Sequence, residues 1–371
     1  MLVGVPKEIK DREFRVGLVP SSVRELIHHG HKVIVETNAG LGSGFSDADY
    51  IAAGAEIVGT AQDIFAKAAL VIKVKEPQPQ ECLMLRAGQT LFTYLHLAPD
   101  PEQTQGLLAS GCTAIAYETV TDARGTLPLL SPMSEVAGRM SIQAGAHCLE
   151  KSQGGRGILL GGVAGVAPAK VVVIGGGVAG TNAARVAIGM EANVIVLDRS
   201  LQRLRELDLQ FGSQLSTVYS TQDALEEHVV CADLVIGAVL VPGAAAPRLV
   251  THAMLKQMKP GSVVLDIAID QGGCFETSHP TTHSEPTYVI DNIVHYCVTN
   301  MPGAVPRTSS CALNNATLPY ALALADHGPK AAMLADQHLL NGLNIHEGQL
   351  TYAAVAHNQG VEFIEPKKAL L

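Results

Sequence analysis

Charged side chains are scarce in this sequence, tryptophan is absent, and no apolar run is both long and unbroken. Charged residues make up 16% and aromatic residues 4% of the 371 positions, whereas hydrophobic residues make up 47%. A chain of this composition can bury a sizeable core and is not expected to be disordered. Its formal net charge of −9 argues against a nucleic-acid-binding protein with a broad basic face, although it does not exclude a local cationic pocket for a small anion.

The cysteine, histidine and apolar patterns exclude several further classes. Seven scattered cysteines without a CxxC pair predict neither a disulfide framework nor a zinc ribbon, and a reducing cytoplasm fits them best. His279 and His283 have HxxxH spacing, but Pro280 between them spoils a helical zinc site, so no metal site is expected. The N-terminus lacks the apolar core of a signal peptide. Polar residues and many glycines interrupt the most apolar stretch, 158–190, so no membrane span is expected.

Short apolar runs alternate with helical patterns in two successive series, which predicts parallel sheets. At roughly 100–200 residues per domain, the length also suggests two domains. The strands expected in the first series are residues 2–5, 32–35, 70–74, 90–94 and 113–116. Six parallel strands are expected in the second series, at residues 170–174, 193–197, 215–219, 233–238, 262–266 and 288–290.

A glycine motif follows the first strand of the second series. Gly175, Gly177 and Gly180 form G-x-G-x-x-G, and the strand expected next ends at Asp198. The glycines permit a tight turn, approach of a pyrophosphate and close packing of strand and helix, while the helix N-terminus attracts phosphate. Asp198 can accept hydrogen bonds from both ribose hydroxyls and would repel a 2′-phosphate, which favours NAD over NADP. Arg199 beside it could instead meet a 2′-phosphate.

These patterns predict an α/β fold with two domains, in which a doubly wound parallel Rossmann sheet is inserted in a discontinuous α/β domain. Residues 309–325 and 330–340 read as helices, and this segment is too short for a third domain. We therefore expect one domain to comprise residues 1–130 and 306–371, and the Rossmann domain to comprise residues 131–305.

A group of cationic residues lies in the first series. Arg15 lies in a polar segment after the first expected strand. Lys75 and His96 each follow an expected strand, at the edge where open α/β sheets bind ligands. An arginine with a lysine makes a natural carboxylate receptor, and a histidine there can exchange protons near neutral pH. The alternative is structural: a surface arginine, a lysine at a strand end and a buried core histidine.

Two aspartates close a late strand of the second series. Asp266 lies near the strand end and Asp270 just beyond it, where a carboxylate would face the nicotinamide. The alternative is that both are loop acids that cap the turn.

Long blocks over essentially the whole chain resemble the alanine dehydrogenase / nicotinamide nucleotide transhydrogenase alpha-subunit family, and within it the alanine dehydrogenases. The blocks, in order, are VGVPKEIKDREFRVGLVP, KVKEPQPQE, LFTYLHLAPD, PMSEVAGRMS, ILLGGVAGV, VVVIGGGVAGTNAA, LDIAIDQGGCFET and NMPGAVPRTSS. The resemblance implies a nucleotide domain inserted in a substrate domain, with the cleft between them. It also implies a homo-oligomer, often a hexamer, that interconverts L-alanine, NAD and water with pyruvate, ammonium and NADH.

The resemblance also implies residue roles. It assigns the substrate carboxylate to Arg15 and Lys75, acid/base catalysis to His96, and the role of catalytic partner to Asp270. The cofactor-binding residues that it implies, besides the motif glycines and Asp270, are Met133, Ser134, Val178, Ala179, Asp198, Arg203, Ser220, Val239, Leu240, Ile267, Asn300 and Met301.

Three alternatives stay open. A transhydrogenase alpha subunit shares the architecture and many glycine motifs but oxidises no amino acid. The joint presence of Arg15, Lys75, His96 and Asp270 favours the dehydrogenase. A non-catalytic NAD-sensing scaffold would lack alanine-dependent NADH formation, and a saccharopine dehydrogenase would need room for a longer substrate.

Overall fold

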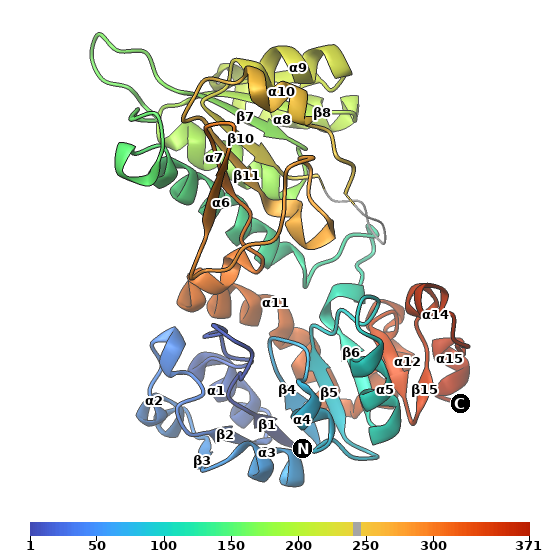
Figure 1. The fold of residues 1–371 in the computed structure, drawn as a ribbon. Coiled ribbons are helices and arrows are strands. Elements are labelled where there is room, and N and C mark those ends of the chain that lie inside the picture. Colours follow the sequence, from blue (N-terminus) through green and yellow to red (C-terminus); the bar gives the residue numbers. More distant parts are fainter. Residues whose placement is uncertain (240–245) are drawn as a thin grey trace. The chain divides into compact units, whose positions relative to one another are not determined.

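The chain divides into two units, each with its own sheet (Figure 1). The computed structural model describes residues 1–239 and 246–371. One unit comprises Met1–Met133 with Val305–Leu371, and the other comprises Ser134–Ala304. No helix in the described part of the chain has the length and hydropathy that crossing a membrane requires.

The first unit is built on an eight-stranded sheet in the order β15-β14-β6-β5-β4-β1-β2-β3. The strands β1 to β6 are mutually parallel, while β14 pairs antiparallel with both β6 and β15. Their bounds are β1 Leu2–Val5, β2 Lys32–Glu36, β3 Glu56–Val58, β4 Leu70–Ile72, β5 Thr90–Thr93, β6 Thr113–Ala116, β14 Leu343–His346 and β15 Gln349–Leu350. Parallel strands covered on both faces must be apolar throughout, and β4, β5 and β6 are accordingly buried at every position.

Helices from both ends of the chain belong to this unit. They are α1 Pro20–His28, α2 Asp47–Ala52, α3 Ala61–Lys67, α4 Pro79–Cys82, α5 Pro101–Ser110, α11 Pro306–His327, α12 Pro329–Ala335, α13 Gln337–Leu340, α14 Ala353–Gln359 and α15 Pro366–Ala369. The tail contributes strands as well as the helices expected from the sequence. Because β14 pairs with β6, the tail completes the sheet that the N-terminal residues begin.

The second unit carries a seven-stranded sheet in the order β12-β13-β11-β10-β7-β8-β9. Its strands are β7 Lys170–Ile174, β8 Asn193–Asp198, β9 Leu215–Tyr219, β10 Leu234–Gly237, β11 Val263–Asp266, β12 Thr287–Ile290 and β13 Ile293–Tyr296. Without β12, the strands numbered along the chain have the order 3-2-1-4-5-6 of a dinucleotide-binding sheet. The predicted fold class, a Rossmann sheet inserted in a discontinuous α/β unit, is confirmed.

Alternate residues along these strands face two separate apolar layers. Val171 and Val173 of β7 lie in one buried cluster with residues of α6 and α7, while Val172 lies in the other with residues of α9 and α10. This alternation is what a sheet covered on both faces requires. The helices of the unit are α6 Ser131–Cys148, which begins in the first unit, α7 Val178–Gly189, α8 Leu201–Phe211, α9 Gln222–Val230 and α10 His252–Gln257.

The prediction of the sixth parallel strand was wrong. Residues 288–290 belong to β12, which runs antiparallel to β13, and β13 is the strand that completes the parallel set. The two are joined by Asp291 and Asn292, which both have positive φ, at 49° and 62°. Two such residues form the turn whose twist suits a β-hairpin. The chain therefore folds back after residue 290, and the strand that follows the turn, β13, is the one that runs parallel to β11.

Candidate nucleotide and substrate sites

The three motif glycines meet different surroundings in the turn between β7 and α7. A Cβ added to Gly180 would lie 1.8 Å from the Gly175 carbonyl oxygen, and Gly175 itself has φ +98°. The protein's own backbone therefore demands glycine at both positions. A Cβ added to Gly177 would meet no atom within 4 Å, and this residue is exposed. Open space at the N-terminus of α7 fits a pyrophosphate, which needs close approach to backbone N–H groups.

Asp198 ties the end of β8 to the glycine turn. Its carboxylate accepts hydrogen bonds from the Gly176 N–H at 2.7 Å and from the Ser200 N–H at 2.8 Å. Arg203 of α8 donates to the Gly176 carbonyl and to the Thr181 hydroxyl, both at 2.6 Å. Asp198 and Arg203, both predicted to bind the cofactor, thus stabilise the glycine turn between β7 and α7.

The other predicted cofactor residues of this unit begin α7 or follow strands at the carboxyl edge of the sheet. Those described are Val178, Ala179, Ser220, Val239, Ile267, Asn300 and Met301. This is the edge at which open α/β sheets bind ligands. Leu240 lies outside the described residues. Ser134 and Met133 lie in the first turn of α6, on either side of the boundary between the units.

The two aspartates after β11 have different surroundings. Asp266 is fully buried and accepts hydrogen bonds from the Ala268 N–H at 3.1 Å, the Cys274 N–H at 2.7 Å and the Ser278 hydroxyl at 2.5 Å. Burial raises the pKa of this carboxyl. Asp266 is therefore the turn cap that the structural alternative describes. Asp270 lies on the 3₁₀ turn that Asp266 caps, Ile267–Gln271, and is exposed.

In the first unit, Arg15 is buried and not a surface cation. It is 3% exposed, and its guanidinium donates two hydrogen bonds to the Glu13 carboxylate, at 2.7 and 2.6 Å. A third nitrogen, Nη1, lies 3.1 Å from the Met133 sulfur. Burial and the positive charge of Arg15 both lower the pKa of the Lys75 ammonium. Arg15 is buried and Lys75 is half-buried, and the charge repulsion that lowers the pKa of Lys75 would be relieved by an anion beside the two cations.

His96 follows β5 and is exposed, so it is not the buried core histidine of the structural alternative. Its ring stacks on that of Tyr94, with centroids 5.7 Å apart and planes inclined by 11°. The Tyr94 hydroxyl donates a hydrogen bond to the Leu129 carbonyl at 2.6 Å, and this bond fixes the ring on which the imidazole stacks. Arg15, Lys75 and His96 all belong to loops at the carboxyl ends of β1, β4 and β5, which are neighbours in the sheet.

Sequence reasoning missed Glu13 and Tyr94. Glu13 could have been found as the acid two residues before Arg15, in a stretch where an arginine leaving solvent needs a partner. Tyr94 lies two residues before His96, so the two side chains share a direction in an extended chain.

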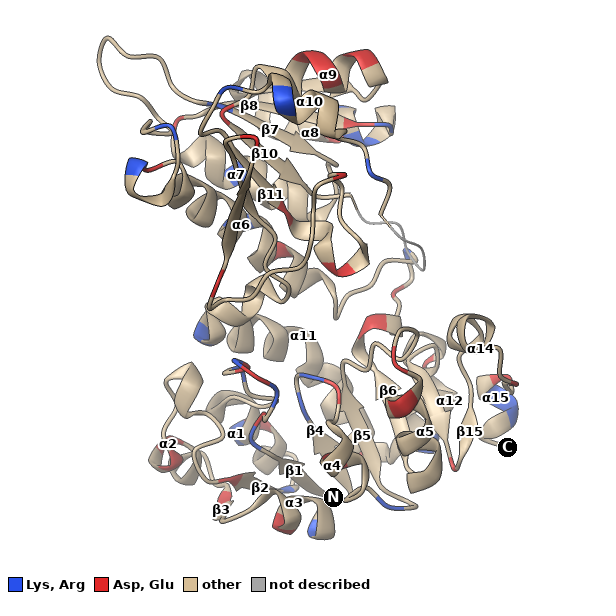
Figure 2. Ribbon diagram, in the orientation of Figure 1, with Lys and Arg blue, Asp and Glu red and all other residues tan. Residues whose placement is uncertain are grey.

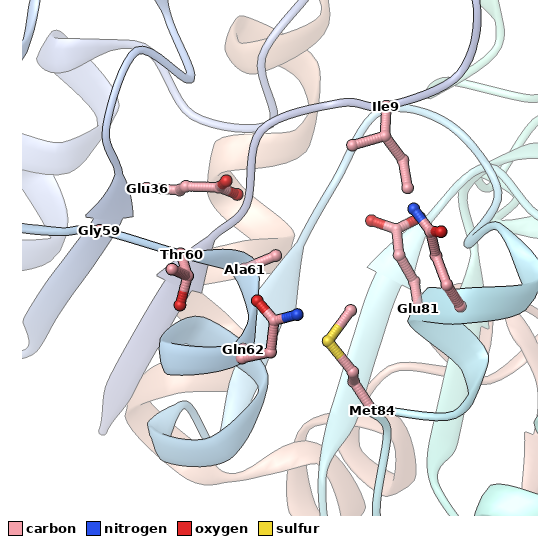
Figure 3. Close-up of a pocket in the computed structure, with 9 residues that line it drawn as sticks. Ile9, Glu36, Gly59, Thr60, Ala61, Gln62, Glu81 and Met84 are labelled. Carbon is pink, nitrogen blue, oxygen red and sulfur yellow. The ribbon is translucent and has the colours of Figure 1, made fainter.

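A separate hollow of about 420 Å³ lies in the first unit, and none of the predicted site residues lines it (Figure 3). Glu36, Thr60, Glu81 and Met84 contribute to its wall. Behind it, the fully buried Lys73 bonds to Glu81 at 2.7 Å and to Glu8 at 3.1 Å. Glu8 also accepts a hydrogen bond from the Lys75 N–H at 3.4 Å, so this ion cluster extends to the backbone of a predicted site residue.

Charge and metal-binding residues add no further candidate. Lysine and arginine are interspersed with aspartate and glutamate along both units (Figure 2). Within residues 1–239 and 246–371, no group of three or more His, Cys, Asp or Glu side chains is arranged to hold a metal ion.

Comparison with known proteins gives consistent matches over nearly the full length. Family profiles described as "Alanine dehydrogenase/PNT, N-terminal domain" and "Alanine dehydrogenase/PNT, C-terminal domain" match residues 4–137 and 141–353. The chain is 62% identical to the alanine dehydrogenase of Halomonas elongata over 98% of both chains. It is also similar to a solved L-alanine dehydrogenase, with a TM-score of 0.95 and 53% identity over 97% of this chain and 99% of that one. A transhydrogenase structure from Sinorhizobium meliloti has a TM-score of 0.82 and 27% identity, covering 95% of this chain and 100% of that chain.

Proposed function

This chain belongs to the alanine dehydrogenase/PNT family, and we propose that it catalyses the reversible, NAD-dependent oxidative deamination of L-alanine to pyruvate and ammonium. The observation that carries this conclusion is the 62% identity to an alanine dehydrogenase over 98% of both chains. The protein is an oxidoreductase that uses a nicotinamide cofactor. A function as a transhydrogenase subunit is disfavoured, because identity to the transhydrogenase is only 27%.

Within this proposal the second unit binds NAD. The open space at Gly177 and the carboxylate of Asp198 support it, because the first suits a pyrophosphate and the second suits a ribose diol. Arg203 holds the glycine turn in shape and also pairs with Glu206 at 2.7 Å, so it is not a receptor reserved for a 2′-phosphate. We therefore propose NAD and not NADP.

The first unit would hold the amino acid or oxo acid. Arg15 and Lys75 would bind the carboxylate, since both cations belong to loops at the carboxyl edge of the sheet and an arginine with a lysine makes a natural carboxylate receptor. Lys75 supports this role further, because its ammonium makes no hydrogen bond or ion pair with any described side chain.

His96 would carry out the proton transfers. The amine of alanine must lose a proton before Cα can release hydride, and an imidazole is suited to accept it near neutral pH. When bound, NAD accepts the hydride from Cα. Water then adds to the resulting cationic imine and its oxygen loses both protons, while the nitrogen takes up one proton and leaves as ammonia. This step therefore releases one proton, and the imidazole is suited to carry these transfers. Asp270 would stabilise the positive charge of the imine.

The test is to incubate the purified protein with L-alanine and NAD and to follow NADH by its absorbance. We expect NADH formation in the unmutated protein and a loss of at least about 10²-fold in turnover for both His96→Ala and Asp270→Asn, with NADH still bound. Absence of alanine-dependent NADH would reject the function. Near-normal turnover of one variant would reject only that residue's role.

We further propose that the protein acts in the cytoplasm and assembles as a homo-oligomer, most simply a hexamer. The seven free cysteines suit a reducing compartment. The sequence resemblance to a family of oligomers supports the assembly, with other copies of this chain as its only macromolecular partners.

A further inference from the structure

The backbone of His96 has an uncommon conformation. Its φ is +49°, in the left-handed region that few residues other than glycine adopt. This conformation costs free energy in a residue that carries a Cβ, so contacts in the surrounding structure must stabilise it. His96 lies three residues after the end of β5, and its conformation changes the direction of the chain there. An extended residue would instead continue in the direction of the strand.

The side chain of Glu118 supplies that hold. One carboxylate oxygen accepts a hydrogen bond from the His96 N–H at 2.6 Å, and both oxygens lie within 3.2 Å of the Leu95 nitrogen. Glu118 lies in the 3₁₀ turn Tyr117–Thr119 that follows β6. Because β5 and β6 are paired in parallel, with Thr93 opposite Ala116, the two strands end side by side.

The ring and the backbone of His96 are thus held by different groups. Tyr94 supports one face of the imidazole, and Tyr117 packs edge-on against Tyr94 with centroids 5.1 Å apart. Glu118 makes its described hydrogen bonds to His96 and Leu95 through backbone nitrogens only. A side-chain oxygen of suitable reach accepts such backbone N–H groups, as at a helix N-terminus, whether it belongs to a carboxylate or to an amide.

We propose that Glu118 is a positioning residue for the reaction, which acts by holding His96 in its left-handed conformation so that the imidazole stays where it can exchange protons with substrate. This inference rests on the role proposed for His96. Glu118 itself takes no proton from the substrate and binds none of its groups. Its effect on turnover depends on the reach of an acceptor oxygen and not on its negative charge.

Two conservative variants of Glu118 distinguish the effect of side-chain length from the effect of the negative charge. Glu118→Gln keeps an oxygen at the same distance and loses the charge, whereas Glu118→Asp keeps the charge and shortens the side chain by one methylene. We expect kcat for alanine oxidation to stay within about threefold in Glu118→Gln and to fall by about tenfold or more in Glu118→Asp and Glu118→Ala, with the KM for NAD unchanged. The reverse order, an active Asp and an inactive Gln variant, would overturn the proposal. This comparison does not require the Ala variant to fold.

A matched control is available four residues away. Asp122 also accepts two backbone N–H groups, from Arg124 at 2.9 Å and Thr126 at 2.8 Å, but none near His96. Asp122→Ala should leave kcat within about twofold of the unmutated value, since it removes a comparable loop contact elsewhere. An equal loss of kcat in Asp122→Ala would mean that Glu118 contributes general loop stability only, and would overturn the proposal.

A double-mutant cycle tests whether Glu118 acts through His96. If it does, adding Glu118→Ala to His96→Ala should slow turnover by less than about twofold, because the group being positioned is already gone. A further loss of about fivefold or more would overturn the inference. If His96→Ala alone keeps normal turnover, the proposed catalytic role fails first. If His96→Ala is slow and the Glu118 variants are all normal, only the positioning role fails.

Discussion

Arg15 and Lys75 illustrate how burial changes what a charged residue does. The pKa of Lys75 is lowered by burial and by Arg15, yet Glu13 neutralises only one of the two cations directly. We expect the remaining positive charge to attract a small carboxylate, because charges attract each other more strongly where little water screens them.

Lys75→Ala should therefore weaken pyruvate binding. A charge-assisted hydrogen bond contributes about 1.5–3 kcal/mol, so the KM for pyruvate should rise by about 10- to 100-fold while the Kd for NADH stays nearly constant. Steady-state kinetics and NADH fluorescence measure the two quantities. Lys67→Ala, which removes an exposed cation of α3, is the control. A collapse of NADH affinity with normal pyruvate affinity would show that Lys75 belongs to the other ligand.

The protonation of Lys75 also sets an alkaline limit. Because its pKa lies below the ordinary 10.5, Lys75 loses its charge at a lower pH than a free lysine does. Affinity for pyruvate should accordingly decline as the pH rises through that lowered pKa, because the uncharged amine no longer attracts the carboxylate. A pH series of the KM for pyruvate provides the measurement, and an unchanged KM up to pH 10.5 would contradict it.

Asp198 is the residue that we expect to decide between the two dinucleotides. We expect NAD to be preferred over NADP by at least about tenfold in kcat/KM, or about 1.4 kcal/mol, because the carboxylate would repel a 2′-phosphate. Asp198→Ala should lower the ratio of kcat/KM for NAD to that for NADP. The control is Asp208→Ala, which removes an exposed carboxylate of α8 and should leave the ratio unchanged. Equal use of both cofactors by the unmutated protein would contradict the assignment.

At the scale of elements, the turn from β7 to α7 separates two needs for glycine. Gly180 is required by the fold, because its Cβ would collide with the Gly175 carbonyl. Gly177 has φ −65°, which any residue can adopt, and its Cβ would lie in open space. We therefore expect that glycine is needed at this second position because of the ligand.

Alanine at these two positions should give opposite results. Gly180→Ala should lower the thermal midpoint, because strand and helix must move apart. Gly177→Ala should leave the midpoint within about one degree and weaken NAD binding by about tenfold or more, because the methyl would occupy the space of the pyrophosphate. Differential scanning fluorimetry and NAD titration measure both. Unchanged NAD affinity in Gly177→Ala would remove this turn from the site.

Strand predictions succeeded where the pattern is local. The runs of β-branched residues that became β7 and β8 could be predicted directly, since at least four consecutive apolar residues lie in the middle or at the end of each strand. The direction of β12 and the existence of β14 could not be read in that way. Both depend on a partner strand, and a short apolar run carries no sign of the strand beside which it will lie.

For the whole molecule, assembly is the property most easily measured. Light scattering coupled to size-exclusion chromatography should give a mass of six times that of one chain, if the proposed hexamer forms. Dilution to nanomolar concentration should preserve that mass, because obligate interfaces are large and apolar. A monomeric mass at all concentrations would contradict the oligomer while leaving the catalytic proposal intact.

The sequence alone determined the α/β class and the Rossmann unit, because a period of apolar residues and a spacing of glycines are local features. It also supplied the residues proposed for the site, some as polar side chains after strands and most through the family resemblance. Only the tertiary structure decided that Arg15 is paired with Glu13, that Asp266 caps while Asp270 is exposed, and that Glu118 holds His96. Glu118 and His96 are 22 positions apart and meet only because two parallel strands end side by side. A side chain's partner is set by strand pairing and burial, which are properties of the folded chain and not of any segment of it.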